Sequence, residues 1–198
     1  MPIDLLLALT VFAFVMAFTP GPNNIMLAAS GVNFGFSRTL PHMAGVTVGF
    51  AVLMIACAAG LGLVFVAVPS LHVALKIAGA AYMLWLAWKV ATAHVTGEEA
   101  GAPARPFTFW QAAAFQWINP KAVVAALSAF ALYVRPGSAA SDFPVMLAVL
   151  TVATLGSVVT WTGFGVALRR WLRNPAYARI FNVAMALLLV ASIAPMVA

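Results

Sequence analysis

Six consecutive residues near the N-terminus interrupt an apolar stretch with groups that cannot continue an ordinary helix. They are Thr19, Pro20, Gly21, Pro22, Asn23 and Asn24. Two prolines and a glycine break the intrahelical hydrogen bonds, and the freed backbone groups need partners from the protein or from water in a cavity. Proline suits the first turn of a renewed helix, which would leave the two asparagine amides free to bind a ligand. The motif therefore predicts a polar site inside an apolar segment.

A second interruption of the same kind lies in the other half of the chain, in the sequence FQWINPK at 115–121. Asn119 followed by Pro120 has the form of an N-cap and a first-turn proline, so we expect another helix to begin there. Helix N-termini in such a setting favour anionic groups. Proline kinks alone are the alternative, because helices in lipid tolerate them. Two breaks with asparagines at both favour a binding site, which we expect to include Gln116, Asn119, Pro120 and Lys121 beside residues 19–24.

Two ionisable residues stand inside or beside apolar stretches. Lys121 is followed by uncharged residues as far as Val134. A charge inside a membrane span costs at least ~2.5–3.5 kcal/mol, so a functional role is the first interpretation and snorkelling to an interface is the alternative. His42 could take part in proton movement, although an interfacial or capping histidine is the favoured interpretation. Both are candidates for coupling to an ion.

The composition excludes a water-soluble protein. Of the 198 residues, 65% are hydrophobic and 7% are charged, whereas soluble domains have about 45–50% apolar and about 25% charged residues. The formal net charge of +6 comes from bases in short loops and not from a basic patch, so no nucleic-acid partner is expected. The single Cys57 excludes an intramolecular disulfide and a multi-cysteine metal site.

Catalytic signatures are missing from the sequence. It contains no HExxH, GxSxG or Walker motif and no paired carboxylates within an apolar stretch. We therefore expect no catalytic residues, no bound metal and no cofactor. The GxxxG of Gly45 and Gly49 predicts close helix packing.

The intervals between charges predict six transmembrane spans. We place them at about 4–33, 41–67, 71–92, 108–134, 143–168 and 176–197. A polar linker at 94–106 separates a first half, 1–93, from a second half, 107–198, with three spans in each. Because three is odd, the second half must insert upside down relative to the first. The expected fold is an all-α integral membrane protein with a 3+3 inverted repeat and broken first and fourth helices.

The loop bases predict the orientation. The loops on one side hold seven of them, and the opposite side holds Lys76 and Arg135. The positive-inside rule puts the seven-base side in the cytoplasm, which makes 94–106 a cytoplasmic linker and leaves both termini outside. Acidic Asp4 argues against a signal peptide, so the first apolar stretch is interpreted as a retained membrane segment. The seven bases are Arg38, Lys89, Arg105, Arg169, Arg170, Arg173 and Arg179.

At TPGPNNIMLAAS, AGVTVGF, LKIAGAAYMLWLAWK and FQWINPKAVVAALSAF, the sequence resembles the LysE/RhtB family of bacterial amino-acid exporters over nearly its whole length. GPNNI, GAAYMLWLAWKVAT and FQWINPK are most similar to the branch that exports cysteine and O-acetylserine. The resemblance implies efflux from the cytoplasm across the bacterial inner membrane, coupling to the proton gradient, and allows a homodimer. Many relatives have an aspartate where this chain has Phe50, which leaves the coupling group open.

The expected function is export of a small neutral amino acid or derivative, of the cysteine, O-acetylserine, homoserine or threonine type. Its carboxylate would lie near Lys121 and the helix starts, and its ammonium near the asparagines and freed carbonyls. A membrane-embedded enzyme and a passive small-solute channel are the alternatives. The enzyme lacks acid-base or nucleophilic groups, and the channel lacks a ring of charges or carbonyls.

Overall fold

The computed structural model describes residues 1–61, 105–135 and 137–191, together with 74, 77, 80, 81, 84, 85, 87, 88, 91 and 92. These residues form helices, and none of the described residues is in a strand. The fold is all-helical, as the sequence predicts. Most of the predicted third span, at 71–92, and most of the linker at 94–106 lie outside the described residues.

The first predicted span consists of two helices, α1 (Ile3–Phe18) and α2 (Pro22–Phe34), bent by 52° at the break. Pro22 is the first residue of α2, where its missing N–H removes no intrahelical hydrogen bond. Several large side chains of α1 are exposed, including Leu7, Val11 and Phe14, whereas α2 is buried along nearly its whole length. The break therefore directs the chain from the surface of the molecule into its interior.

The helix α3 (Phe36–Ala56) follows α2 after one residue. That residue, Gly35, has a φ of 78°, a left-handed conformation that glycine adopts without steric strain. The sequence predicted a span beginning at 41, five residues later. Pro41 lies in the second turn of α3, where it removes one intrahelical hydrogen bond, a loss that membrane helices tolerate. A short π-helical turn, η1 (Cys57–Leu61), follows, and Gly60 within it has a non-helical φ of 107°.

The fourth predicted span is also two helices, α6 (Phe109–Ile118) and α7 (Pro120–Tyr133). A capping box starts α6: Gln111 donates its backbone N–H to Thr108 Oγ1 (3.3 Å), and Thr108 donates its own to Gln111 Oε1 (3.0 Å). Asn119 ends α6 and caps α7. Both interruptions predicted from the prolines are present in the fold.

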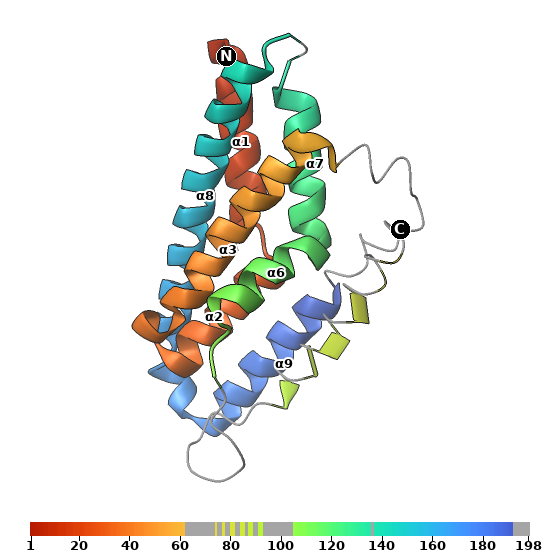
Figure 1. Ribbon diagram of the computed structural model, residues 1–198. Coiled ribbons are helices and arrows are strands. Elements are labelled where there is room, and N and C mark those ends of the chain that lie inside the picture. Colours follow the sequence, from red (N-terminus) through yellow and green to blue (C-terminus); the bar gives the residue numbers. More distant parts are fainter. Residues whose placement is uncertain are drawn as a thin grey trace.

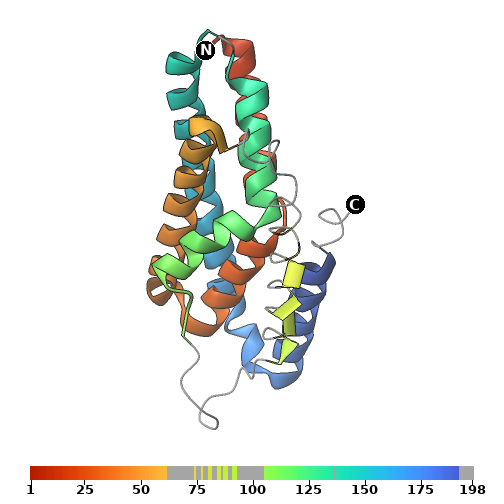
Figure 2. The same cartoon turned by 45° about the vertical axis from the view of Figure 1, so that its right-hand side comes forward.

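The chain then forms α8 (Ala139–Leu168), a short 3₁₀ turn η2 (Trp171–Arg173) and α9 (Pro175–Ala191). α1, α7 and α8 extend along the long axis of the molecule, and α3 and α6 are inclined to them in the view of Figure 1; Figure 2 shows the same helices from another side. The N-terminus lies beside the start of α8.

The helices contact each other closely at glycines, because glycine has no side chain to separate them. A Cβ on Gly45 would overlap the carbonyl of Phe109, and one on Gly49 would lie 2.6 Å from the Cα of Ala113, so α3 packs directly on the backbone of α6. A Cβ on Gly165 of α8 would overlap the carbonyl of Ala28 in α2. Backbone-to-backbone packing of this kind is typical of membrane helices.

Among the described residues, two helical segments are long and apolar enough to cross a membrane, Phe36–Gly60 and Ala139–Leu168. The bent pair α1 and α2 would make a third span. The helices α7 and α9 are apolar but shorter. Six spans and the 3+3 inverted repeat remain a prediction.

An ion pair fixes the connection between α7 and α8. Arg135 donates to Asp142 through Nε (2.8 Å to Oδ2) and Nη2 (3.0 Å to Oδ1), and Asp142 is fully buried. The hydrogen bonds to Asp142 raise the pKa of the Arg135 guanidinium above its usual value. The sequence placed Asp142 just before a span beginning at 143. The helix begins at Ala139 instead, so the carboxylate lies in its first turn, where it also complements the helix dipole.

Alanine at Gly45 or Gly165 should destabilise the fold, because the new methyl group would meet a backbone carbonyl that cannot move away by itself. Overpacking of this kind costs about 1–3 kcal/mol, and we expect a lower midpoint of thermal unfolding in detergent. Gly163→Ala is the matched control in α8, since no atom lies within 4 Å of the point where its Cβ would stand. Equal unfolding midpoints for all three variants would contradict the packing described above.

Candidate functional site

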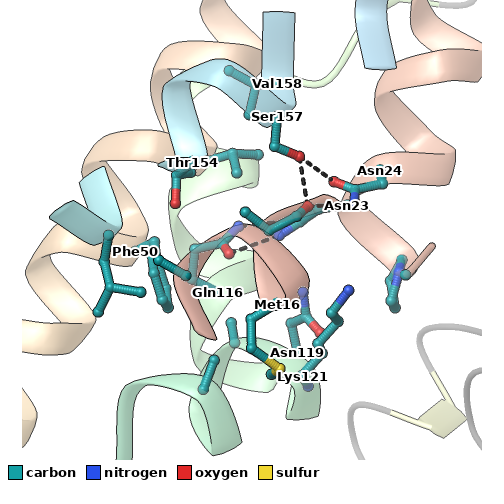
Figure 3. A pocket seen from close by; sticks show the side chains of 18 residues that line it. Met16, Asn23, Asn24, Phe50, Gln116, Asn119, Lys121, Thr154, Ser157 and Val158 are labelled. Carbon is teal, nitrogen blue, oxygen red and sulfur yellow. Dashed lines mark hydrogen bonds between the residues drawn. The ribbon is translucent and has the colours of Figure 1, made fainter. Parts of the chain in front are cut away.

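A pocket lies where the two breaks meet, with walls from α1, α2, α3, α6, α7 and α8 (Figure 3). Its apolar wall includes Met16, Val46, Phe50 and Leu150. The pocket thus combines a polar patch with an apolar surface inside a bundle of apolar helices. Its polar side chains are Asn23, Asn24, Gln116, Asn119, Lys121, Thr154 and Ser157.

Lys121 connects the second break to the first. It is in the first turn of α7, and its ammonium donates to the carbonyl of Thr19 (2.6 Å) and to Thr19 Oγ1 (2.8 Å). The side chain passes directly over Gly21, where a Cβ would lie only 2.8 Å from Lys121 Cδ. The C-terminal end of α1 carries the negative end of a helix dipole, which favours a cation. Lys121 is therefore held at the one end of the break that stabilises its charge.

A pair of amides also joins the two breaks. Asn23 donates from Nδ2 to Gln116 Oε1 (2.8 Å), and Gln116 donates from Nε2 to Asn23 Oδ1 (3.4 Å) and to the carbonyl of Ala112 (2.8 Å). Gln116 is buried, whereas Asn23 is partly exposed. These contacts cross between the two predicted halves of the chain.

Asn24 satisfies backbone groups that the first break leaves open. Its Nδ2 donates to the carbonyls of Ala17 (2.8 Å) and Thr19 (2.9 Å). Ser157 of α8 donates to the same Ala17 carbonyl (2.6 Å) and lies 3.3 Å from Asn24 Oδ1. Asn24 lines the pocket, but its side chain also acts as a C-terminal cap for α1.

The remaining residues of the two motifs mainly determine where the helices end and begin. Asn119 is buried and accepts the Lys121 backbone N–H at its Oδ1 (3.2 Å), so its side chain caps α7. Pro120 is the first residue of that helix. Pro22 lines the pocket, whereas Thr19 and Pro20 are exposed and are not part of its wall. Thr19 enters the site through its contact with Lys121.

His42 is not part of the pocket wall, and neither its interfacial interpretation nor its role in proton movement is tested by the contacts of its side chain. Its side chain is 1% exposed, and its ring lies 5.3 Å from that of Phe107. Neither ring nitrogen has a hydrogen-bond partner in the described part of the chain. The reason is that α3 begins at Phe36, which places His42 inside the helix and against the segment that leads into α6.

Ser157 and Thr154 are pocket residues that we did not predict. They lie three positions apart in α8, so they share a face of that helix. Small polar residues at this spacing in an apolar helix were the available signal. That signal was weak, because α8 also has Thr151, Thr160 and Thr162.

The pocket has one cationic side chain and no acidic one among its described wall residues. In the part of the chain that the structure describes, no group of three or more His, Cys, Asp or Glu residues lies close enough to hold a metal. Phe50 stands in the wall, 8% exposed, so the residue at this position of the pocket is an apolar ring. The site offers amide groups, hydroxyls and one ammonium to a small polar ligand.

Comparison with known proteins identifies the family. The family model described as LysE type translocator matches residues 14–193. Cysteine/O-acetylserine efflux proteins of Escherichia coli (strain K12), Escherichia coli O9:H4 (strain HS) and Shigella flexneri serotype 5b (strain 8401) are each 36% identical over 189 residues, covering 94% of both chains. No solved structure matches the chain. The chain belongs to the LysE family and is a membrane transporter for amino-acid efflux, not an enzyme.

Proposed function

We propose that the protein exports a small neutral amino acid of the cysteine or O-acetylserine type across the bacterial inner membrane. The observation that carries the proposal is the pocket at the meeting point of the two helix breaks. The names of the relatives support this substrate class. The pocket's amides and hydroxyls suit a polar ligand, and its apolar wall suits a short side chain.

One side of the site favours an anion and the other favours a cation, which matches the two charges of an amino acid. The starts of α2 and α7 are positive helix ends, and Lys121 adds a full positive charge, so we assign the carboxylate to this side. The carbonyls of Ala17 and Thr19, at the end of α1, accept hydrogen bonds and suit the ammonium group. A zwitterion places one charge on each of these two sides.

Alternating access would come from movement of the two predicted halves, 1–93 and 107–198, against each other. The contacts of Lys121 with Thr19 and of Asn23 with Gln116 cross this boundary and also border the pocket. A ligand between the same groups would therefore act on the contacts that hold the halves together. Assembly as a homodimer, which the resemblance to the family allows, stays part of the proposal.

Efflux driven by the proton gradient also remains part of the proposal. Phe50 cannot carry a proton, so the candidates among the described residues are Lys121 at the pocket and His42 at the interface of α3 and α6. His42 is buried with both ring nitrogens unpartnered among the described residues. If another conformation gave this imidazole a partner or water, its protonation would be linked to the transport cycle.

Replacing Lys121 with Gln should abolish or uncouple efflux. The variant keeps length and polarity but removes the charge that would meet the carboxylate, and we expect a loss of about 10- to 100-fold in exchange of labelled cysteine or O-acetylserine by proteoliposomes. Lys121→Arg should also fail in large part, because a guanidinium is wider and does not release its proton.

Arg170→Gln is the matched control, since it removes an exposed base in the turn after α8. It should exchange substrate at the original rate. Unchanged exchange and unchanged pH dependence in Lys121→Gln would show that the lysine has no role at the site. A wild-type protein that exchanged neither compound would contradict the proposed substrate class.

Reporter fusions should place both termini outside and residues 94–106 in the cytoplasm. The expectation follows from the seven bases assigned to one side against two on the other. Fusion of a reporter that is active only outside the cytoplasm should therefore give signal at the C-terminus and none within 94–106. A cytoplasmic C-terminus would exclude this orientation or the even number of spans that the inverted repeat requires.

A further inference from the structure

We propose that Lys121 makes a carboxylate obligatory in any transported molecule, because its ammonium occupies the position that a substrate ammonium needs. This inference rests on the proposed function and assigns Lys121 a role in specificity. The lysine would leave the end of α1 only for a ligand that brings an anion to receive it. A plain amine brings none.

The occupied position is the end of α1. The ammonium of Lys121 lies 2.6 Å from the Thr19 carbonyl and 2.8 Å from Thr19 Oγ1. The other carbonyl assigned to the ammonium, that of Ala17, already accepts hydrogen bonds from Asn24 and Ser157. A ligand ammonium that approaches this end of the helix therefore meets a protein ammonium first.

The charges of the described wall decide which ligands can displace the lysine. The wall contains one cationic side chain and no acidic one in its described residues, so a displaced Lys121 has no carboxylate of the protein beside it. An amine would add a second positive charge and leave the first without a partner. A zwitterion exchanges the contact with Thr19 for a contact with its own carboxylate, so both ammonium groups stay paired.

The structure leaves room for this exchange. Lysine has a flexible four-carbon stem, and the stem crosses Gly21, where no side chain blocks it. Lys121 and Asn119 lie beside each other at one side of the pocket, and Asn23 and Gln116 lie across from them (Figure 3). Lys121 lines the pocket as well as contacting Thr19, so a turn of its side chain toward a ligand in the pocket is a short movement.

Removal of the lysine leaves an intact acceptor site. The Thr19 carbonyl still accepts a hydrogen bond from Asn24 (2.9 Å), and the Thr19 hydroxyl donates to the carbonyl of Val15 (2.7 Å). In a Lys121→Met variant the end of α1 therefore keeps its shape and gains space for an external ammonium. We expect this variant to prefer amines over amino acids, which is the reverse of the wild type.

The test compares L-cysteine with cysteamine, which has the same thiol and ammonium but no carboxylate. Binding is measured by titration calorimetry on the detergent-purified full chain under reducing conditions at neutral pH, for wild type, Lys121→Met and Lys121→Gln. The wild type should bind cysteine at least about 10-fold more tightly than cysteamine. Both variants should lose cysteine affinity and bind cysteamine more tightly than the wild type does, Lys121→Met by at least about 10-fold.

Two results would overturn the inference while leaving the proposed function in place. One is a wild type that binds cysteamine as tightly as cysteine. The other is a set of monodisperse variants in which neither gains cysteamine affinity over the wild type. If Lys121→Met does not fold, the cysteamine affinity of Lys121→Gln decides between these outcomes. A wild type that binds neither L-cysteine nor O-acetyl-L-serine would instead remove the proposed function, and the inference with it.

Discussion

The carbonyl groups at the end of α1 impose the constraint on which the rest of the site depends. A helix that stops inside an apolar bundle leaves its last carbonyls without intrahelical partners, and lipid supplies no donors. In this protein the donors come from three other helices: Asn24 in α2, Lys121 in α7 and Ser157 in α8. The break in one helix therefore determines which polar residues the neighbouring helices must place beside it, and these residues form the pocket.

The helices around this break also pack closely. The helices that supply these donors, and the helices next to them, are in close contact at glycines, which bring α2 against α8 and α3 against α6. Gly165 brings α8 against the backbone of α2, which holds Ser157 near the break. Gly49 brings α3 against α6, close to Gln116. Small residues in this family member thus set the geometry of a polar site that they do not line.

Much of this arrangement follows from local sequence chemistry. The prolines at 22 and 120 and the asparagine at 119 predict where α2 and α7 begin, because their effects depend only on adjacent residues. The composition and charge pattern likewise predict an all-helical membrane protein. Lys121 stands out in the sequence because a charge in an apolar run has a known cost.

Other features depend on neighbours that are distant in the chain, and the sequence does not indicate them. Ser157 is one of several hydroxyl residues in α8, and only its proximity to Ala17 gives it a role. The burial of His42 is another such feature: the sequence put it at the start of a span beginning at 41, whereas Gly35 allows the helix to begin at Phe36 and places His42 inside it. The sequence also did not indicate the hydrogen-bond partner of the Lys121 ammonium, which in the structure is Thr19.

The central claim is that the contact between Lys121 and the end of α1 belongs to the transport site, and Gly21→Ala tests it most directly. Gly21 has an extended backbone (φ −169°) that alanine adopts freely, so the substitution changes neither the charge nor the chain path. Its Cβ would lie 2.8 Å from Lys121 Cδ and 3.1 Å from Nζ, so the lysine must move. We predict that the half-saturation concentration or the rate of cysteine exchange in proteoliposomes changes by about threefold or more, while Gly163→Ala matches the wild type. Gly21→Ala that exchanges cysteine with wild-type rate and half-saturation would contradict the claim.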